Sequence, residues 1–498
     1  MQPSQLKHPA RSLGIDHSKS SMLLVSGGVL ASLLIGVVAG VFGGIAALIS
    51  LSFALVMAIA IGDYRAGILL ALVLLPLSAT SLIPRELFGI TGFNPLNATL
   101  LMTATSLLFM FLFHRGELAV PGFPRAFWIY LAAMTLAALH GAFQVSSIPP
   151  YYQALQIVNF NTPLGYLRDV FLKPVLILIT AYMLSIAIRN ARRPTVFLVA
   201  LFFSAIILPI ATVAYLAGAG FSLAELAHSE SRGALTALGM HANEFGLMFN
   251  MAFALALFCF INMPGGFAKW MLGLVIVVLV AAIMLTFSRG AYIGFLAVMA
   301  WFLYTQRKFS IMLFGLVLIP AAILVIPNAV VERATLGAQD RNLDTISAGR
   351  LDGIWRPLLP DVQASPLVGN GLNAILWSEA AQRGAILKVA HPHSAYLGVL
   401  LDLGVLGVLV IALFFWHMRR IFSALAEQST EPIWRGFFRG AMACILLLLV
   451  QGLTDDRFTP TFPQTFLWLA YGIAIGMMAR NEANLIAHDF HSRHPVAI

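Results

Sequence analysis

Residues 20–62 form an unbroken stretch without a single charged side chain. Since a helix needs about 20 apolar residues to cross a bilayer, this stretch can hold two transmembrane helices. The rest of the 498-residue chain has the same character, because 60% of all residues are hydrophobic and 10% are charged, whereas a soluble domain carries roughly 25% charged residues. The sequence therefore predicts an all-α polytopic membrane protein.

Hydropathy predicts about fourteen transmembrane helices, of which the tenth is short. Their approximate ranges are 22–40, 43–61, 66–83, 96–113, 126–143, 170–188, 195–217, 246–263, 270–287, 291–304, 310–327, 395–416, 436–453 and 463–479. The predicted organisation is an N-terminal tail (1–20), eleven helices (21–327), a large loop (328–394), three more helices (395–480) and a C-terminal tail (481–498).

The distribution of Lys and Arg predicts the orientation, because cytoplasmic segments of membrane proteins are enriched in these residues. With both termini in the cytoplasm, 18 of the 30 basic residues fall on inner segments and 14 of the 21 acidic residues on outer ones. The net charge of +9 therefore reflects topology and gives no indication of nucleic-acid binding. The first twenty residues are too polar for a cleaved signal peptide, so we expect the first span to be retained.

The largest outer loop, residues 328–394, is predicted to be partly helical. Five apolar residues recur at the spacing of an amphipathic helix: Leu351, Ile354, Trp355, Leu358 and Leu359. Pro357 is expected to kink or end this helix. A loop of this length can form a lid or small cap over a cavity, and the alternative is an ordinary solvated loop.

Two histidines, His391 and His393, lie where this loop enters the next predicted span. Histidine is the side chain best suited to proton transfer near neutral pH, so the pair is a candidate catalytic site. No metal site is predicted, because no third ligand accompanies the two imidazoles. Cys259 and Cys444 lie inside predicted spans, where a thiol usually behaves as a small apolar group.

Three arginines of the outer face, Arg232, Arg289 and Arg350, stand beside glycine. The guanidinium group is a planar fork of donors that suits phosphate oxygens, and a neighbouring glycine permits close backbone approach. Together the three arginines predict a phosphate-bearing ligand at the outer membrane surface. For each one taken alone, the alternative is a snorkelling interface charge or an ion pair.

Two further polar residues complete the set of candidates. Asp402 follows Ser394 by eight residues, about 12 Å along a helix. An intramembrane carboxylate is costly enough to indicate function, either as a partner of His393 or Arg289 or as the lining of a polar cavity. Asn243 lies in a polar cluster at the outer start of the eighth predicted span.

Taken in order, these motifs resemble the O-antigen ligase and polymerase superfamily. The motifs are Ser288-Arg289-Gly290, Gly349-Arg350 with Trp355, Pro366-Leu367-Val368-Gly369-Asn370-Gly371, His391-Pro392-His393-Ser394-Ala395-Tyr396-Leu397 and Asp402-Leu403-Gly404-Val405-Leu406-Gly407. The stretch from Arg232 to Gly246, which includes Asn243, is similar to another motif of the family. The chain departs from the family pattern at Ser394, where Asn is more usual, and at Asp402, where Glu is more usual.

The resemblance implies a metal-independent, inverting glycosyltransferase of a bacterial inner membrane that uses no cofactor. Its expected donor is a glycan linked to undecaprenyl diphosphate, and its expected acceptor is lipid A-core, a protein or another glycan, at the periplasmic face among membrane lipids. Carried over by position, His393 is the general base, Arg289 and Arg232 hold the diphosphate, and Arg350 is a further donor contact. His391, Asp402 and Asn243 are the expected supporting residues.

Three functions stay open at this stage. A ligase moves a finished glycan onto an acceptor, whereas a polymerase joins repeat units carried on two lipids, and both use the same leaving-group chemistry. A polysaccharide flippase or secondary transporter is the third alternative. Transporters more often place their key charges near the bilayer midplane, whereas the candidates here gather at the outer face.

Overall fold

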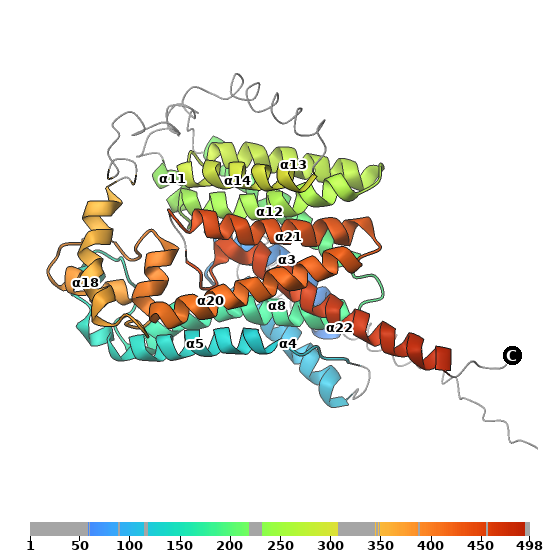
Figure 1. Cartoon of the computed structure of the whole chain (residues 1–498), viewed down its shortest axis with the longest axis horizontal. Helices are drawn as coiled ribbons and strands as arrows, with labels where there is room; N and C mark the ends of the chain where they lie inside the picture. Colours follow the sequence, from blue (N-terminus) through green and yellow to red (C-terminus); the bar gives the residue numbers. More distant parts are fainter. Residues whose placement is uncertain are drawn as a thin grey trace, which may run out of the picture.

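The computed structural model describes residues 60–87, 90–113, 118–218, 232–306, 349–386, 389–454 and 457–493, together with residues 58, 344 and 347. Within these ranges the regular structure is helical apart from one antiparallel pair of two-residue strands, β1 (Glu86–Leu87) and β2 (Ile90–Thr91). The long helices lie side by side in a bundle, and α18 lies with other short helices at one end (Figure 1). We call this end the cap end.

Eleven long helices make up the bundle in the described part of the chain. They are α3 (Tyr64–Ser78), α4 (Pro95–Phe113), α5 (Arg125–Phe143), α8 (Lys173–Asn190), α9 (Thr195–Gly218), α12 (Ala242–Asn262), α13 (Phe267–Leu285), α14 (Arg289–Gln306), α20 (Ala395–Gln428), α21 (Pro432–Gln451) and α22 (Thr465–Arg493). Each coincides with one of the fourteen predicted spans. Of the other three, 22–40 and 310–327 lie outside the described residues, and 43–61 lies almost wholly outside them.

Nine helical stretches among the described residues are long and apolar enough to cross a membrane. Two of the eleven long helices are not among these nine. They are α3, which has only 15 residues, and α14, which has 18 residues. The all-α membrane class is therefore confirmed, whereas the number of fourteen spans and the orientation stay predictions.

Glycines allow some of the long helices to pack backbone against backbone. A Cβ atom at Gly436 of α21 would lie 2.4 Å from the Phe258 carbonyl oxygen of α12, and one at Gly472 of α22 would lie 2.2 Å from the Ala181 carbonyl oxygen of α8. Small residues take this role because helices in a lipid solvent associate through close packing. The tight α12–α21 pair fixes the two helix ends that border the candidate site.

Two segments at the cap end share a second, smaller apolar core. The first is residues 144–169, with η1 (Val145–Ser147), α6 (Tyr151–Ala154) and α7 (Pro163–Tyr166), which leads into η2 (Leu167–Leu172). The second is residues 349–392, with η3 (Leu351–Trp355), α18 (Arg356–Ala364), η4 (Ala374–Trp377) and α19 (Glu379–Gln382). The core includes Ile148, Tyr152, Phe160, Ile354, Leu358 and Leu376. We call these two segments the cap.

Tyrosine hydroxyls join the two segments of the cap. Tyr166 donates to the Leu372 carbonyl at 2.5 Å, and Tyr152 donates to the Val389 carbonyl at 3.1 Å. Burial raises the pKa of Tyr152 well above its ordinary value, so this hydroxyl keeps its proton and stays a donor. The described part of the large loop is thus a packed cap, as the first of the two alternatives predicted.

The helix predicted in this loop forms with two differences. Pro357 does not end it, because η3, a π-helical turn, runs directly into α18, and this wider turn accommodates a residue without an N–H donor. Ile354 and Leu358 are buried as expected, but Leu359 is 48% exposed, so the apolar stripe is narrower than predicted.

α20 is interrupted at Gly404, whose backbone (φ 63°, ψ −167°) is not helical. The peptide groups near this break bond to the cap: Val405 N–H donates to the Pro366 carbonyl at 2.9 Å, and Asn370 N–H donates to the Leu401 carbonyl at 2.9 Å. A Cβ atom at Gly369 would lie 2.4 Å from the Asp402 carbonyl carbon. The two glycine-containing motifs at 366–371 and 402–407 are therefore one interlocked structure.

Exposed tryptophans mark the opposite end of the bundle. Trp128 and Trp270 lie near the starts of α5 and α13, and Trp416 lies in the second half of α20, with exposed fractions of 56%, 78% and 56%. The guanidinium carbon of Arg419 lies 5.3 Å from the centroid of the Trp416 ring. Tryptophans with basic neighbours are typical of membrane–water interfaces, so we expect one interface near the level of Trp416.

We expect Gly404→Ala to lower the free energy of unfolding by about 2–4 kcal/mol, because a side chain is disfavoured at this φ and would also overpack the interlock. Its Cβ would lie 2.4 Å from the Leu367 carbonyl carbon. Thermal unfolding of the purified protein in detergent measures the effect. Gly398→Ala is the matched control in the same helix, since its Cβ would meet no atom closer than 3.8 Å. Equal midpoints for the two variants would contradict the interlock.

Candidate functional site

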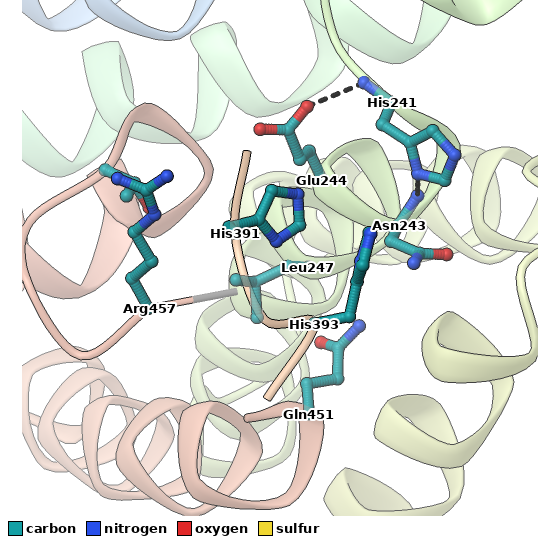
Figure 2. A pocket seen from close by; sticks show the side chains of 9 residues that line it. His241, Asn243, Glu244, Leu247, His391, His393, Gln451 and Arg457 are labelled. Atoms are coloured by element: carbon teal, nitrogen blue, oxygen red, sulfur yellow. Dashed lines mark hydrogen bonds between the residues drawn. The ribbon is translucent and has the colours of Figure 1, made fainter. Parts of the chain in front are cut away.

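A cavity of about 260 Å³ lies at the cap end of the bundle. Four pieces of chain surround it: the start of α12, the segment before α20, the end of α21 and the loop that follows α21. The residues that line it are His241, Asn243, Glu244, Leu247, His391, His393, Gln451, Arg457 and Thr461. Figure 2 shows His391 and His393 in the middle of this group, with Arg457 on one side and Asn243 on the other. Polar and basic groups thus converge from segments far apart in the sequence.

His391 and His393 lie together in this cavity, with ring centroids 4.0 Å apart. The backbone of His393 has a φ of 53°, which is uncommon for a residue with a side chain and is often found at functional sites. The Trp355 indole N–H donates to the Pro392 carbonyl at 2.8 Å. The Ser394 hydroxyl accepts the N–H of the third residue of α20 at 3.4 Å. The bond from Trp355 of the cap and the bond to the Ser394 side chain at the start of α20 together fix the turn that presents both imidazoles.

The start of α12 forms a second wall. His241 caps this helix, since its Nδ1 accepts the Asn243 N–H at 3.3 Å, and the Glu244 carboxylate accepts the His241 N–H at 2.6 Å. This reciprocal arrangement is a capping box, which stabilises the first turn. His241 is therefore a structural hydrogen-bonding residue as well as part of the lining.

Asn243 connects the cavity to the turn that carries Arg289. The Ser288 hydroxyl donates to Asn243 Oδ1 at 2.6 Å and accepts the Ala291 N–H at 3.2 Å. The turn between α13 and α14 is short, and Phe287 within it has a φ of 47°. Arg289 starts α14 directly after Ser288 and is half-buried. It is not among the residues that line the cavity, but it borders the hydrogen bond that Asn243 makes there.

Arg350 reaches the same corner from the cap. Its guanidinium donates to the Thr454 carbonyl, and a Cβ at Gly290 would lie 3.3 Å from the Thr454 hydroxyl oxygen. The structure therefore brings Arg350 and Gly290, the neighbour of Arg289, to one loop. Arg232 starts α11 (Arg232–Ala237), and its side chain lies outside the described residues.

Asp402 anchors the cap. Its carboxylate oxygens accept the backbone N–H groups of Asn373 and Ala374 at 3.0 and 2.9 Å. It also lines a small cavity of about 20 Å³ together with Ser394 and Arg457. Asp402 thus lies next to the segment that carries His393, and its supporting role stays a prediction.

Arg457 is the main site residue that sequence reasoning missed. It lines both the histidine cavity and the small cavity of Asp402. Its position after Thr454-Asp455-Asp456, without a neighbouring glycine or serine, gave no phosphate-site signal. Gln451 was also missed: it is 3% exposed, lines the cavity, and its Oε1 has no hydrogen-bond partner among the described residues.

This arrangement combines a proton acceptor with an anion site. Either imidazole can take a proton from a hydroxyl group that enters the cavity, and the adjoining guanidinium groups can stabilise negative charge that develops on a phosphate. Within the described residues, no three His, Cys, Asp or Glu side chains are grouped in a way that could hold a metal ion.

Fold and site together define a polytopic helical membrane protein with a packed cap and a cavity that is lined by histidine and arginine side chains. Residues 274–412 match the family model described as O-antigen ligase. The match over these residues supports the O-antigen ligase and polymerase superfamily that the motifs predicted. The matched range includes Arg289, Arg350, both histidines and Asp402. Among curated proteins, no sequence matches this chain.

We expect Asp402→Ala to loosen η4, because two backbone N–H groups of the cap lose their acceptor at about 1–3 kcal/mol each. Hydrogen exchange of residues 373–377, followed by mass spectrometry, should be faster by about tenfold or more. Asp352→Ala is the control, since Asp352 is 54% exposed and forms a surface ion pair with Arg356. Unchanged exchange in Asp402→Ala would remove its anchoring role.

Proposed function

We propose that this protein transfers a glycan from an undecaprenyl-diphosphate carrier to a hydroxyl group of an acceptor, as an O-antigen ligase-like glycosyltransferase. One observation carries the proposal: His391 and His393 share a cavity with Arg457, and Asn243 connects this cavity to the turn that carries Arg289. The family match over residues 274–412 supports the same reaction class.

In the proposed step, His393 accepts the proton of the acceptor hydroxyl while the oxygen of that hydroxyl attacks the anomeric carbon. A new glycosidic bond forms, and the bond between the anomeric carbon and the diphosphate oxygen breaks, with inversion of configuration. Undecaprenyl diphosphate leaves with the bonding electron pair. A diphosphate is already a good leaving group, so base catalysis and charge stabilisation suffice, and the proposed reaction requires neither metal nor cofactor.

The arginines divide this work in the proposed mechanism. Arg289 and Arg232 hold the diphosphate, and Arg457 adds a positive charge inside the cavity itself. Arg350 already donates to the Thr454 carbonyl, so we assign it first to the position of this loop and second to the donor. His391 and Asn243 support His393 and Arg289 respectively, and Asp402 supports the histidine turn through the cap.

The proposed orientation places this cavity at the periplasmic face of a Gram-negative inner membrane. At the end opposite the cap, the described helix ends and connections carry many basic side chains. They include Arg65, Arg125, Arg189, Arg192, Arg193, Lys269, Arg419, Arg420, Arg435, Arg439 and Arg480. This excess is typical of the cytoplasmic side.

We expect His393→Ala and Arg289→Ala each to lower the transfer rate by about 10²–10⁴-fold, because each removes base or charge stabilisation from the transition state. Arg457→Ala should lower it as well, and Arg457→Lys should restore part of the rate because a charge returns without the planar fork. Product formation from a lipid-linked glycan measures the effect, after insertion and the unfolding midpoint are checked. Arg356→Ala, at a side chain that is 63% exposed, is the control. Full activity in His393→Ala and Arg289→Ala would refute this site.

The acceptor decides between the ligase and the polymerase. Purified protein is incubated with a lipid-diphosphate-linked glycan, in the presence of a metal chelator, with and without lipid A-core. A product that forms only with the added acceptor is expected for the ligase. A ladder from the donor alone would make the protein a polymerase, and movement of the glycan across a vesicle membrane without any covalent product would favour a transporter.

A further inference from the structure

A second cavity, of about 460 Å³, lies between α20 and α22 at the end opposite the cap. Its size falls within the range of small-molecule sites, roughly 300–1,000 Å³. Its polar lining is His417, Arg420, Gln428, Asn481 and Glu482. The rest of the lining is apolar and includes Leu425 and Met478. An apolar wall with a few convergent polar groups is typical of a site for an amphiphile.

The depth of this cavity corresponds to the headgroup layer of a membrane. Trp416 is 56% exposed, and Arg419 lies over its ring, an arrangement that marks the membrane–water interface. His417 and Arg420 follow within one turn of α20. Towards the membrane interior, Leu409 and Leu413 of the same helix are 53% and 66% exposed, and they offer an apolar surface for an acyl chain.

The polar groups of this cavity are not satisfied by one another. His417 Nε2 is buried and has no hydrogen-bond partner among the described residues. Among the ion pairs that the described residues form, none involves Arg420 or Glu482. The Arg420 and Glu482 side chains are therefore available to an occupant of the cavity that they line.

We propose that this cavity binds the headgroup of a phospholipid that carries both a phosphate and a primary ammonium group, as in phosphatidylethanolamine. Arg420 and His417 contact the phosphate, since a guanidinium and an imidazole N–H are both donors to anionic oxygens. Glu482 pairs with the ammonium group, and the amide oxygens of Asn481 and Gln428 accept its remaining N–H bonds. The acyl chains follow the exposed apolar face of α20.

The charges of the site distinguish this headgroup from the alternatives. Arg420 and Glu482 cancel formally, which matches a zwitterion, whereas the Glu482 carboxylate repels a headgroup with only a negative charge. A quaternary choline has no N–H to donate to a carboxylate or an amide oxygen, so it loses these hydrogen bonds. The proposal therefore predicts that phosphatidylethanolamine binds more tightly than phosphatidylcholine and more tightly than phosphatidylglycerol.

Native mass spectrometry of the purified full-length protein tests this order. The protein is titrated in detergent with phosphatidylethanolamine, phosphatidylcholine and phosphatidylglycerol of identical acyl chains. We expect about tenfold tighter binding of the ethanolamine lipid, the size of effect that hydrogen bonds to a charged group provide. Equal retention of the three lipids would overturn the proposal.

Matched variants locate the site. Arg420→Ala should weaken binding of the ethanolamine lipid by about tenfold, and Arg419→Ala, whose guanidinium lies over Trp416, should leave it unchanged. Glu482→Gln should remove the preference for ethanolamine over choline. Glu427→Gln, at a carboxylate that accepts the Ser423 hydroxyl at 3.0 Å, should retain it. If Arg420→Ala and Arg419→Ala behave alike, or if Glu482→Gln keeps the preference, the headgroup does not bind here.

Discussion

The structure depends on the way in which α20 is broken. A peptide group without a partner costs several kcal/mol inside a membrane, so a span can be interrupted only where other protein groups replace the lost helical bonds. At Gly404 these groups come from the cap, since Val405 donates to Pro366 and Asn370 donates to Leu401. The break therefore attaches the cap to the bundle, and the cap in turn fixes the histidine turn through the bond from Trp355 to Pro392.

The candidate site follows from this attachment, because no single segment could build it. The histidines come from the end of the cap, Asn243 from the start of α12, and Arg457 from the loop after α21. Each segment is held by bonds that do not involve a ligand: the capping box of α12, the hydroxyl of Ser288, and the guanidinium of Arg350 on Thr454. A site held in this way is preorganised, which is the condition for electrostatic stabilisation of a transition state.

The sequence predicted what depends on local patterns. Apolar length predicted all eleven long helices. Histidine and arginine chemistry selected His391, His393, Arg289 and Arg350 as candidates, and their roles stay predictions. Three features escaped this reasoning because they depend on tertiary contacts. Arg457 enters the cavity from a loop without a motif, Asp402 bonds to cap residues about thirty positions earlier in the chain, and Leu359 is exposed because the π-helical turn of η3 rotates the stripe.

α20 connects the two ends of the molecule. With 34 residues and a rise of 1.5 Å per residue, it is longer than the hydrocarbon layer of about 30 Å, so hydrophobic length alone leaves its depth and tilt open. The interlock at Gly404 and the cap fix its first part. A headgroup bound at Arg420 and Glu482 would fix the other part at the opposite membrane surface. Both ends of one helix would then set the depth of the histidine turn in the bilayer. This depth determines the distance of the turn from a diphosphate that is anchored in the same bilayer.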